Sequence, residues 1–107
     1  MSEESETYVA ARELGRLLID AGFRVMTGGL CGVMEAASRG AHESACYREG
    51  DTIGLLPQGD PGEANPWVDI VLPTGMGHAR NSLVASGDAL VAVGGGAGTL
   101  SEIAFAW

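Results

Sequence analysis

Three short glycine-rich segments hold the residues best suited to bind a ligand. They contain Gly28, Gly29 and Gly32, then Gly75 and Gly77, and finally Gly94, Gly95, Gly96 and Gly98. Each segment lies at or just after an apolar run, as loops at strand ends do. Glycine lets the backbone approach a ligand closely, and the N–H groups at a helix start bind anions. This spacing predicts loops that hold an anionic group such as phosphate.

The segment at residues 93–102 carries the strongest signal. It reads as a strand, a loop with Gly95, Gly96 and Gly98, and a helix that opens at Thr99. The Thr99 hydroxyl can cap that helix and can also donate to a phosphate oxygen. The segment lacks the third glycine of the dinucleotide fingerprint and the Gly-Lys-Ser/Thr of the P-loop. An anion site is favoured here over a plain tight turn.

The other two segments also follow apolar runs. For Gly28, Gly29 and Gly32, the alternative to an anion loop is a tight turn with close helix–strand packing. Arg80 falls in the first turn of a predicted helix, where a cation can clamp a phosphate, and an exposed surface cation is the alternative. His78 could act as an acid or base, although polar residues are common at helix starts. Open α/β sheets bind ligands outside the carboxyl ends of their strands, so the segments could converge there.

Two acidic residues stand in equivalent places after glycine loops. Glu35 and Glu102 each lie near the start of a predicted helix. An acid there stabilises the helix dipole, and either side chain could instead hydrogen-bond a ribose or stabilise positive charge on it. Cys31 and Cys46 are too few for a disulfide framework, while the position of Cys31 near a helix start leaves a redox or ligand role open.

Helices and strands alternate along the chain. Apolar residues at helical spacing predict helices over 7–21 and 30–45, a short helix over 78–86 and another that begins at 99. Continuous apolar runs predict strands over 23–27, 52–56, 68–72 and 89–93. Such runs are typical of parallel strands that are covered on both faces. The pattern predicts an α/β fold with a doubly wound parallel sheet, in a single domain over 1–107.

Both ends of the sequence are unusual for a doubly wound sheet. The chain starts with a helix rather than a central strand, and it ends on an apolar helical stretch over 103–107. We therefore expect a fragment that lacks the first strand and the C-terminal elements of a longer domain. A compact four-strand domain is the alternative.

The charge balance excludes several classes of partner. Six Lys+Arg against 14 Asp+Glu give a net charge of −8, and all six cations are arginine. A nucleic-acid backbone or an anionic membrane surface requires a basic patch, so neither is expected as a partner. The sequence shows neither a membrane-spanning apolar run nor a signal peptide, and we expect a cytoplasmic protein.

Three motifs in order resemble the Lonely-Guy-type family, whose members were once mislabelled lysine decarboxylases. GGAGTLSE at 95–102 is similar to its GGxGTxxE core, GGLCGVM at 28–34 to its GGxxGxM segment, and MGHARN at 76–81 to its arginine-bearing segment. The resemblance covers about residues 8–107. It implies a Rossmann-like fold that binds nucleotide phosphates and similar ligands. We expect no metal site, and no cofactor other than molybdenum cofactor as bound cargo.

The resemblance also leaves alternative functions open. Hydrolase members cleave the N-glycosidic bond of nucleoside 5′-monophosphates, with Arg80 holding phosphate or ribose and Glu102 supporting cleavage. Gly94 stands where the hydrolases carry proline, and Ala79-Arg80-Asn81 replaces their Glu-Arg-Lys. The chain is more similar to the molybdenum-cofactor carrier subgroup, which binds that cofactor as cargo. We therefore expect a binding protein for a phosphorylated small molecule, homo-oligomeric in its full-length form. A hydrolase and an inactive remnant are the alternatives.

Overall fold

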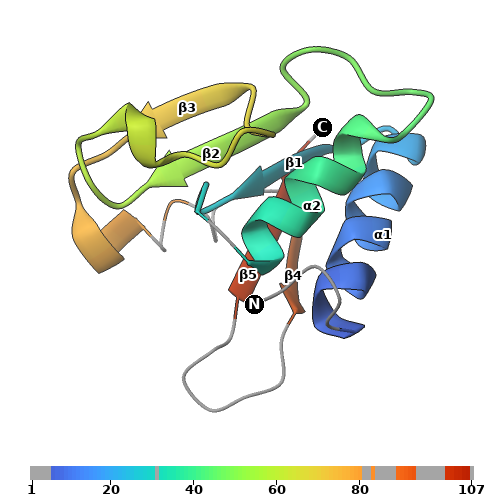
Figure 1. Cartoon of the computed structure of the whole chain (residues 1–107), viewed down its shortest axis with the longest axis horizontal. Coiled ribbons are helices and arrows are strands. Elements are labelled where there is room, and N and C mark those ends of the chain that lie inside the picture. The colour runs from blue at the N-terminus through green and yellow to red at the C-terminus, as the bar shows by residue number, and fades with distance from the viewer. Residues whose placement is uncertain (1–5, 31, 81–82, 84–88, 94–100, 107) are drawn as a thin grey trace.

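The computed structural model describes residues 6–30, 32–80, 83, 89–93 and 101–106. Two α-helices and five strands make up most of this part of the chain, together with two short 3-10 helices (Figure 1). In chain order these are α1 (Glu6–Asp20), β1 (Arg24–Thr27), α2 (Val33–His42), β2 (Thr52–Leu56), η1 (Pro61–Glu63), β3 (Ile70–Pro73), η2 (Gly77–Arg80), β4 (Ala89–Val93) and β5 (Ser101–Ala106).

The strands form one sheet in the order β3-β2-β1-β5-β4. β1, β2 and β3 are parallel, with Val25 opposite Thr52 and Ile53 opposite Ile70. β5 is antiparallel to both β1 and β4. Because β1 and β4 both run against β5, β4 points in the same direction as β1, β2 and β3. The α/β, Rossmann-like fold class is confirmed, and these strands share one carboxyl edge.

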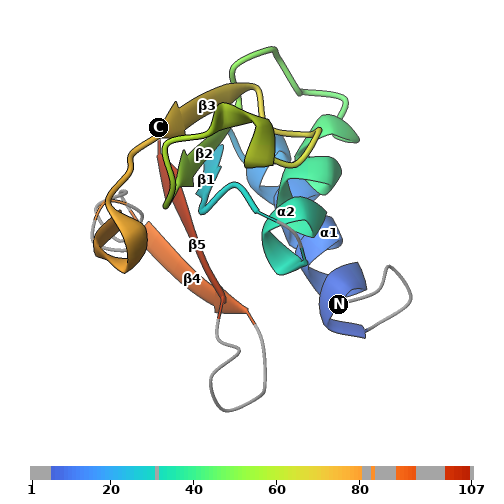
Figure 2. The ribbon, with the colours of Figure 1, turned by 60° about the vertical axis from the view of Figure 1, so that its left-hand side comes forward.

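The helices α1 and α2 lie on the same face of the sheet (Figure 2). Glycine lets them touch backbone to backbone. A Cβ added to Gly15 would lie 2.0 Å from the carbonyl oxygen of Ala37, and one added to Gly40 would lie 1.7 Å from that of Arg12. The core between helices and sheet is built from small and medium side chains, among them Ala11, Ile19, Val25, Val33, Ala36, Ala37 and Ala41.

The end of α1 agrees with the sequence prediction. Gly22 has a φ of +93°, and its N–H donates to the carbonyl of Ile19. The N–H of Phe23 donates to the carbonyl of Leu18. This pair of bonds is the Schellman arrangement, in which glycine ends a helix at low cost. Across the described residues, no helix is both long and apolar enough to cross a membrane.

One prediction about the second half of the chain is wrong, and the structure describes another only in part. The helix expected from residue 99 is instead the strand β5, so the sheet is mixed rather than wholly parallel. Ile103 and Phe105 favour strands, and β5 supplies hydrogen-bond partners to the edge of β1 that β2 leaves open. Of the helix expected over 78–86, the structure describes the 3-10 helix η2 and a helical residue, Leu83, and the remaining residues lie outside the described set.

Candidate functional site

The carboxyl edge of the sheet gathers the predicted loops that the structure describes. Gly28 and Gly29 follow β1, the Thr74–Gly77 stretch follows β3, and β4 ends at this edge. β5 begins here, with Glu102 paired to Ala92, and its side chain is outside the described set. The convergence of strand-end loops on one edge is therefore present for these segments.

The turn after β1 packs tightly on β2. Gly29 has a φ of +78°, and a Cβ added there would lie 2.7 Å from the Leu56 side chain and 3.3 Å from the Cα of Gly54. The N–H of Gly29 donates to Thr27 Oγ1 at 3.0 Å. Gly29 is thus required by backbone conformation and by close packing, and its N–H is used within the loop.

Asn65 holds the same turn from the other side, and sequence reasoning missed it. Its Nδ2 donates to the carbonyl oxygens of Gly29 at 3.2 Å and Leu30 at 2.8 Å. Its backbone N–H also donates to the Gly29 carbonyl at 2.9 Å, and Oδ1 accepts from the Trp67 N–H at 3.0 Å. The side chain is only 5% exposed. Asn65 lies in a stretch of turn-forming residues, and no periodic pattern there distinguishes a buried asparagine from an exposed one.

The start of α2 supplies backbone donors next to this turn. The N-cap residue Gly32 has a φ of +77°, and no side chain in the described part of the chain caps this helix end. The first bond within the helix runs from the Ala36 N–H to the Gly32 carbonyl at 2.9 Å. The N–H groups at the start of the helix, up to that of Glu35, have no carbonyl acceptor within the helix. They and the helix dipole favour an anion at this end.

The loops after β2 and β3 are tied together. Thr74 donates to the Leu56 carbonyl through its N–H at 3.0 Å and its hydroxyl at 2.6 Å. Gly75 and Gly77 have φ values of +67° and +59°, and a Cβ added to either would meet nothing within 4 Å. Glycine is therefore needed there for its backbone conformation, and space for a neighbouring group remains open.

The remaining predicted residues are placed only in part. Arg80 is the last residue of η2 and His78 lies within it, but their side chains are outside the described set. Gly95, Gly96, Gly98 and Thr99 all lie outside the described residues, as does Cys31. The structure thus brings Gly28, Gly29, Gly32 and Gly75 to one edge, and the roles of Arg80, Glu102 and the 94–100 loop stay predictions.

Comparison with known families agrees with this architecture. The whole chain, residues 1–107, matches the SLOG cluster4 family. The chain belongs to the SLOG cluster4 family. Over 104 residues it is 43% identical to an uncharacterized protein of Archaeoglobus fulgidus. The aligned region covers 96% of this chain and 66% of that protein.

Two solved structures are similar to this SLOG chain. One is the molybdenum cofactor binding protein from the phototrophic bacterium Rippkaea orientalis, with 38% identity and a TM-score of 0.65, covering 74% of this chain and 47% of that one. The other is TM1055, a structural genomics target, with 34% identity and a TM-score of 0.63, covering 78% and 46%. The chain therefore spans about two thirds of the archaeal relative and just under half of each solved chain.

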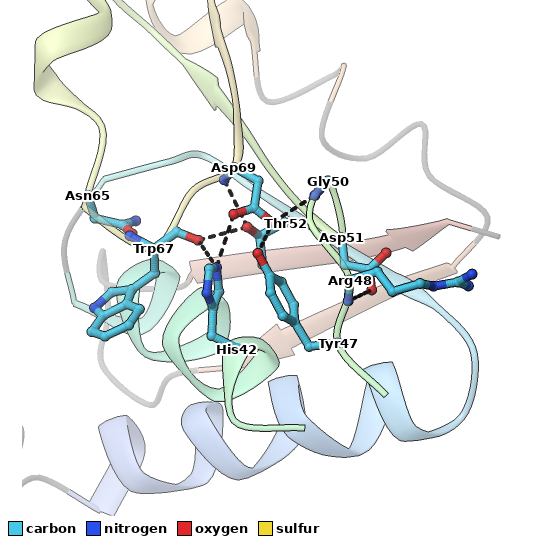
Figure 3. A network of polar contacts seen from close by, with 9 residues as sticks. All are labelled: His42, Tyr47, Arg48, Gly50, Asp51, Thr52, Asn65, Trp67 and Asp69. Atoms are coloured by element: carbon cyan, nitrogen blue, oxygen red, sulfur yellow. Dashed lines mark hydrogen bonds and ion pairs between the residues drawn. The ribbon is translucent and has the colours of Figure 1, made fainter. Parts of the chain in front are cut away.

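The opposite, amino edge of the sheet carries a polar network centred on Asp69 (Figure 3). Asp69 Oδ2 accepts from the Tyr47 hydroxyl at 2.7 Å and from the Gly50 N–H at 3.0 Å. The backbone N–H of Asp69 donates to Thr52 Oγ1 at 2.9 Å. His42 Nε2 lies 3.2 Å from Asp69 Oδ1. These residues are called the amino-edge network below.

Titration in this network follows from its contacts. Burial by itself would raise the pKa of Asp69, but hydrogen bonds from Tyr47 and Gly50 and the nearby His42 lower it below its ordinary value. Burial and the hydrogen bond to Asp69 raise the pKa of Tyr47. Each polar group meets a partner within the protein, and the network joins the end of α2 to the starts of β2 and β3. We interpret it as structural.

Proposed function

We propose that this SLOG chain binds a phosphorylated small molecule at the carboxyl edge of its sheet. The observation that carries the proposal is that glycine turns after β1 and β3 share this edge with the start of α2, which no described side chain caps. Backbone donors at a helix start suit the oxygens of a phosphate.

The ligand class that we favour is a nucleotide or a molybdenum-cofactor-like pterin that carries a phosphate. The similarity to the Rippkaea orientalis molybdenum cofactor binding protein supports the pterin. The cofactor would then be cargo rather than a resident group. In this proposal Gly32 and Gly75 border the anion, Gly28 and Gly29 shape the turn, and Arg80 supplies a cation. Gly95, Gly96, Gly98 and Thr99 add the loop that the family resemblance predicts. A homo-oligomeric state and a cytoplasmic location are part of the same proposal.

Nuclear magnetic resonance of the 107-residue chain tests the site. Titration with inorganic phosphate, AMP or a phosphorylated pterin should shift the amide signals of Gly32 to Glu35 and of Gly75. Signals of the amino-edge network, such as that of Gly50, should stay in place and serve as the internal control. Shifts confined to the amino edge, or no shifts with any of these ligands, would refute the proposal.

The alternative function is cleavage of the N-glycosidic bond of a nucleoside 5′-monophosphate. The position of Glu102 in β5, beside the end of β4 at the carboxyl edge, is the observation that favours it. In that reaction Glu102 would support cleavage and Arg80 would hold the phosphate or ribose. Incubation with AMP, followed by chromatography for free adenine, separates the two functions. Release that is abolished in a Glu102→Gln variant supports the hydrolase, whereas AMP binding without release supports the carrier.

A further inference from the structure

We propose that Asn65 is a positioning residue for the anion site, and that its side-chain amide directs the backbone N–H of Leu30 toward the bound anion. This inference rests on the proposed function. It concerns a residue distant in sequence from the predicted glycine loops, and it starts from the carbonyl groups that Asn65 holds.

The geometry of a trans peptide links those carbonyls to the site. All peptide bonds in the described residues are trans. In a trans peptide the C=O and N–H groups point in opposite directions. The carbonyl of Gly29 points at Asn65, which donates to it from both the backbone N–H and Nδ2. The N–H of the same peptide belongs to Leu30, so it points away from the buried Asn65.

The orientation of the Asn65 amide is itself fixed. Both Nδ2 hydrogens are used, one for Gly29 and one for Leu30, and Oδ1 accepts from the Trp67 N–H. The Trp67 carbonyl accepts in turn from Thr52 Oγ1 at 2.7 Å and lies 2.7 Å from His42 Nε2. Asn65 is therefore held by the amino-edge network, and a continuous chain of hydrogen bonds runs from that network to the turn after β1.

A substitution at position 65 removes the side-chain donors that orient the turn after β1 but keeps the backbone bond that attaches it. The backbone N–H of Asn65 keeps its bond to the Gly29 carbonyl whatever the side chain. The Leu30 carbonyl, in contrast, loses the side-chain donor that holds it at 2.8 Å. The turn thus stays attached to the 58–69 segment through one backbone bond. The Gly29–Leu30 peptide, which carries the Leu30 N–H, loses one of its two donors and is then held at a single point about which it can rotate. Ligand affinity is expected to fall more than stability accounts for.

The test compares three variants with the wild-type chain, using AMP and inorganic phosphate as probes. Asn65→Ala removes the amide. Asp60→Ala is the matched control in the same segment, because Asp60 Oδ1 accepts only from the nearby Gly62 N–H at 2.9 Å among the contacts described. Ser44→Ala removes a buried hydroxyl that bonds Asp20 and the Cys46 N–H beyond the C-terminal end of α2, and it serves as the control for loss of stability. Dissociation constants come from calorimetry, melting temperatures from circular dichroism, and the environment of the Leu30 N–H from its amide signal.

We expect Asn65→Ala to weaken AMP binding by roughly tenfold or more, the effect of one lost hydrogen bond to a charged group. Its Leu30 amide signal should shift even without ligand. Asp60→Ala and Ser44→Ala should bind AMP as the wild type does. This should hold even at temperatures where Ser44→Ala is as destabilised as Asn65→Ala. If Asn65→Ala does not fold, Asn65→Ser replaces it, since a hydroxyl has one donor hydrogen where the amide has two.

The outcomes distinguish the two proposals. Equal affinity of Asn65→Ala and the wild type would overturn the positioning role and leave the proposed function intact. An affinity loss that Ser44→Ala reproduces at equal stability would also overturn it. If the wild type binds neither probe, the proposed function is wrong for these ligands, and the positioning role is refuted with it.

Discussion

Replacement of Asp69 by asparagine removes the negative charge at the centre of the amino-edge network without changing its shape. The carboxylate accepts from Tyr47 and Gly50 and faces His42, and its side chain is 11% exposed. An asparagine oxygen in place of Oδ2 keeps the first two bonds as weaker, neutral ones. Its NH₂ group then meets His42 Nε2, which must donate to the Trp67 carbonyl, so two donors oppose each other.

The magnitude follows from these contacts. A hydrogen bond to a charged group contributes about 1.5–3 kcal/mol, and a neutral one contributes about half of that. Two weakened bonds and one donor–donor conflict give an expected loss of about 2–4 kcal/mol in the free energy of unfolding near neutral pH. Asp60→Asn is the matched control, because Asp60 is exposed and caps only the short η1. It should change stability by less than about 0.5 kcal/mol.

The dependence on pH provides a second, independent signature. The pKa of Asp69 is lowered in the folded protein, so its contribution is fully present above the unfolded value of about 3.9 and is lost as the pH falls. Urea unfolding followed by circular dichroism should show that the difference in unfolding free energy between wild type and Asp69→Asn narrows as the pH falls below about 4. A loss below about 1 kcal/mol at neutral pH, or a gap that widens with acid, would refute the reasoning.

Three further predictions follow from other contacts. Thr27→Val should cost about 1–3 kcal/mol, because the Gly29 N–H loses its acceptor, and urea unfolding that shows no loss would contradict this. Gly40→Ala should cost about 3 kcal/mol, because the new Cβ would overlap the Arg12 carbonyl; an unchanged melting temperature would show that the helices can separate freely. AMP affinity, measured by calorimetry, should stay level or rise as the salt concentration increases from about 20 to about 200 mM, because salt screens repulsion between AMP and a chain of net charge −8. A tenfold fall in affinity would indicate a basic binding surface instead.

Local signals in the sequence predicted much of the fold. The predicted strands at 52–56 and 89–93 match β2 and β4. A short apolar run between turn-forming residues is typical of a buried strand. α1 ends at Asp20, within one residue of the helix end predicted at residue 21. The stretch after residue 99 could not be decided locally, since Ile103-Ala104-Phe105 suits a helix or a strand, and pairing with β1 selects the strand.

The contacts around the site could not be predicted because they join distant segments. The amino-edge network brings together His42, Tyr47, Thr52 and Asp69 from four places in the chain. Asn65 reaches the glycine turn across 35 residues. The residues next to each of these side chains in the sequence give no sign of its distant partner. Glycine differs, because a positive φ restricts the residue type at a single position, and this made the turns visible in the sequence.

The negative net charge is compatible with an anion site because the donors are backbone groups. Three ion pairs on the helices neutralise part of the acidic charge, and they join Arg12 to Glu43 and Arg16 to both Glu13 and Asp20. Charges farther than a Debye length of about 8 Å from the ligand are largely screened at physiological salt. The dipole of α2 and its N–H groups act within hydrogen-bond distance, where screening is weak. In the proposed site, the affinity for an anion should therefore depend on the orientation of these backbone donors rather than on the net charge of the chain.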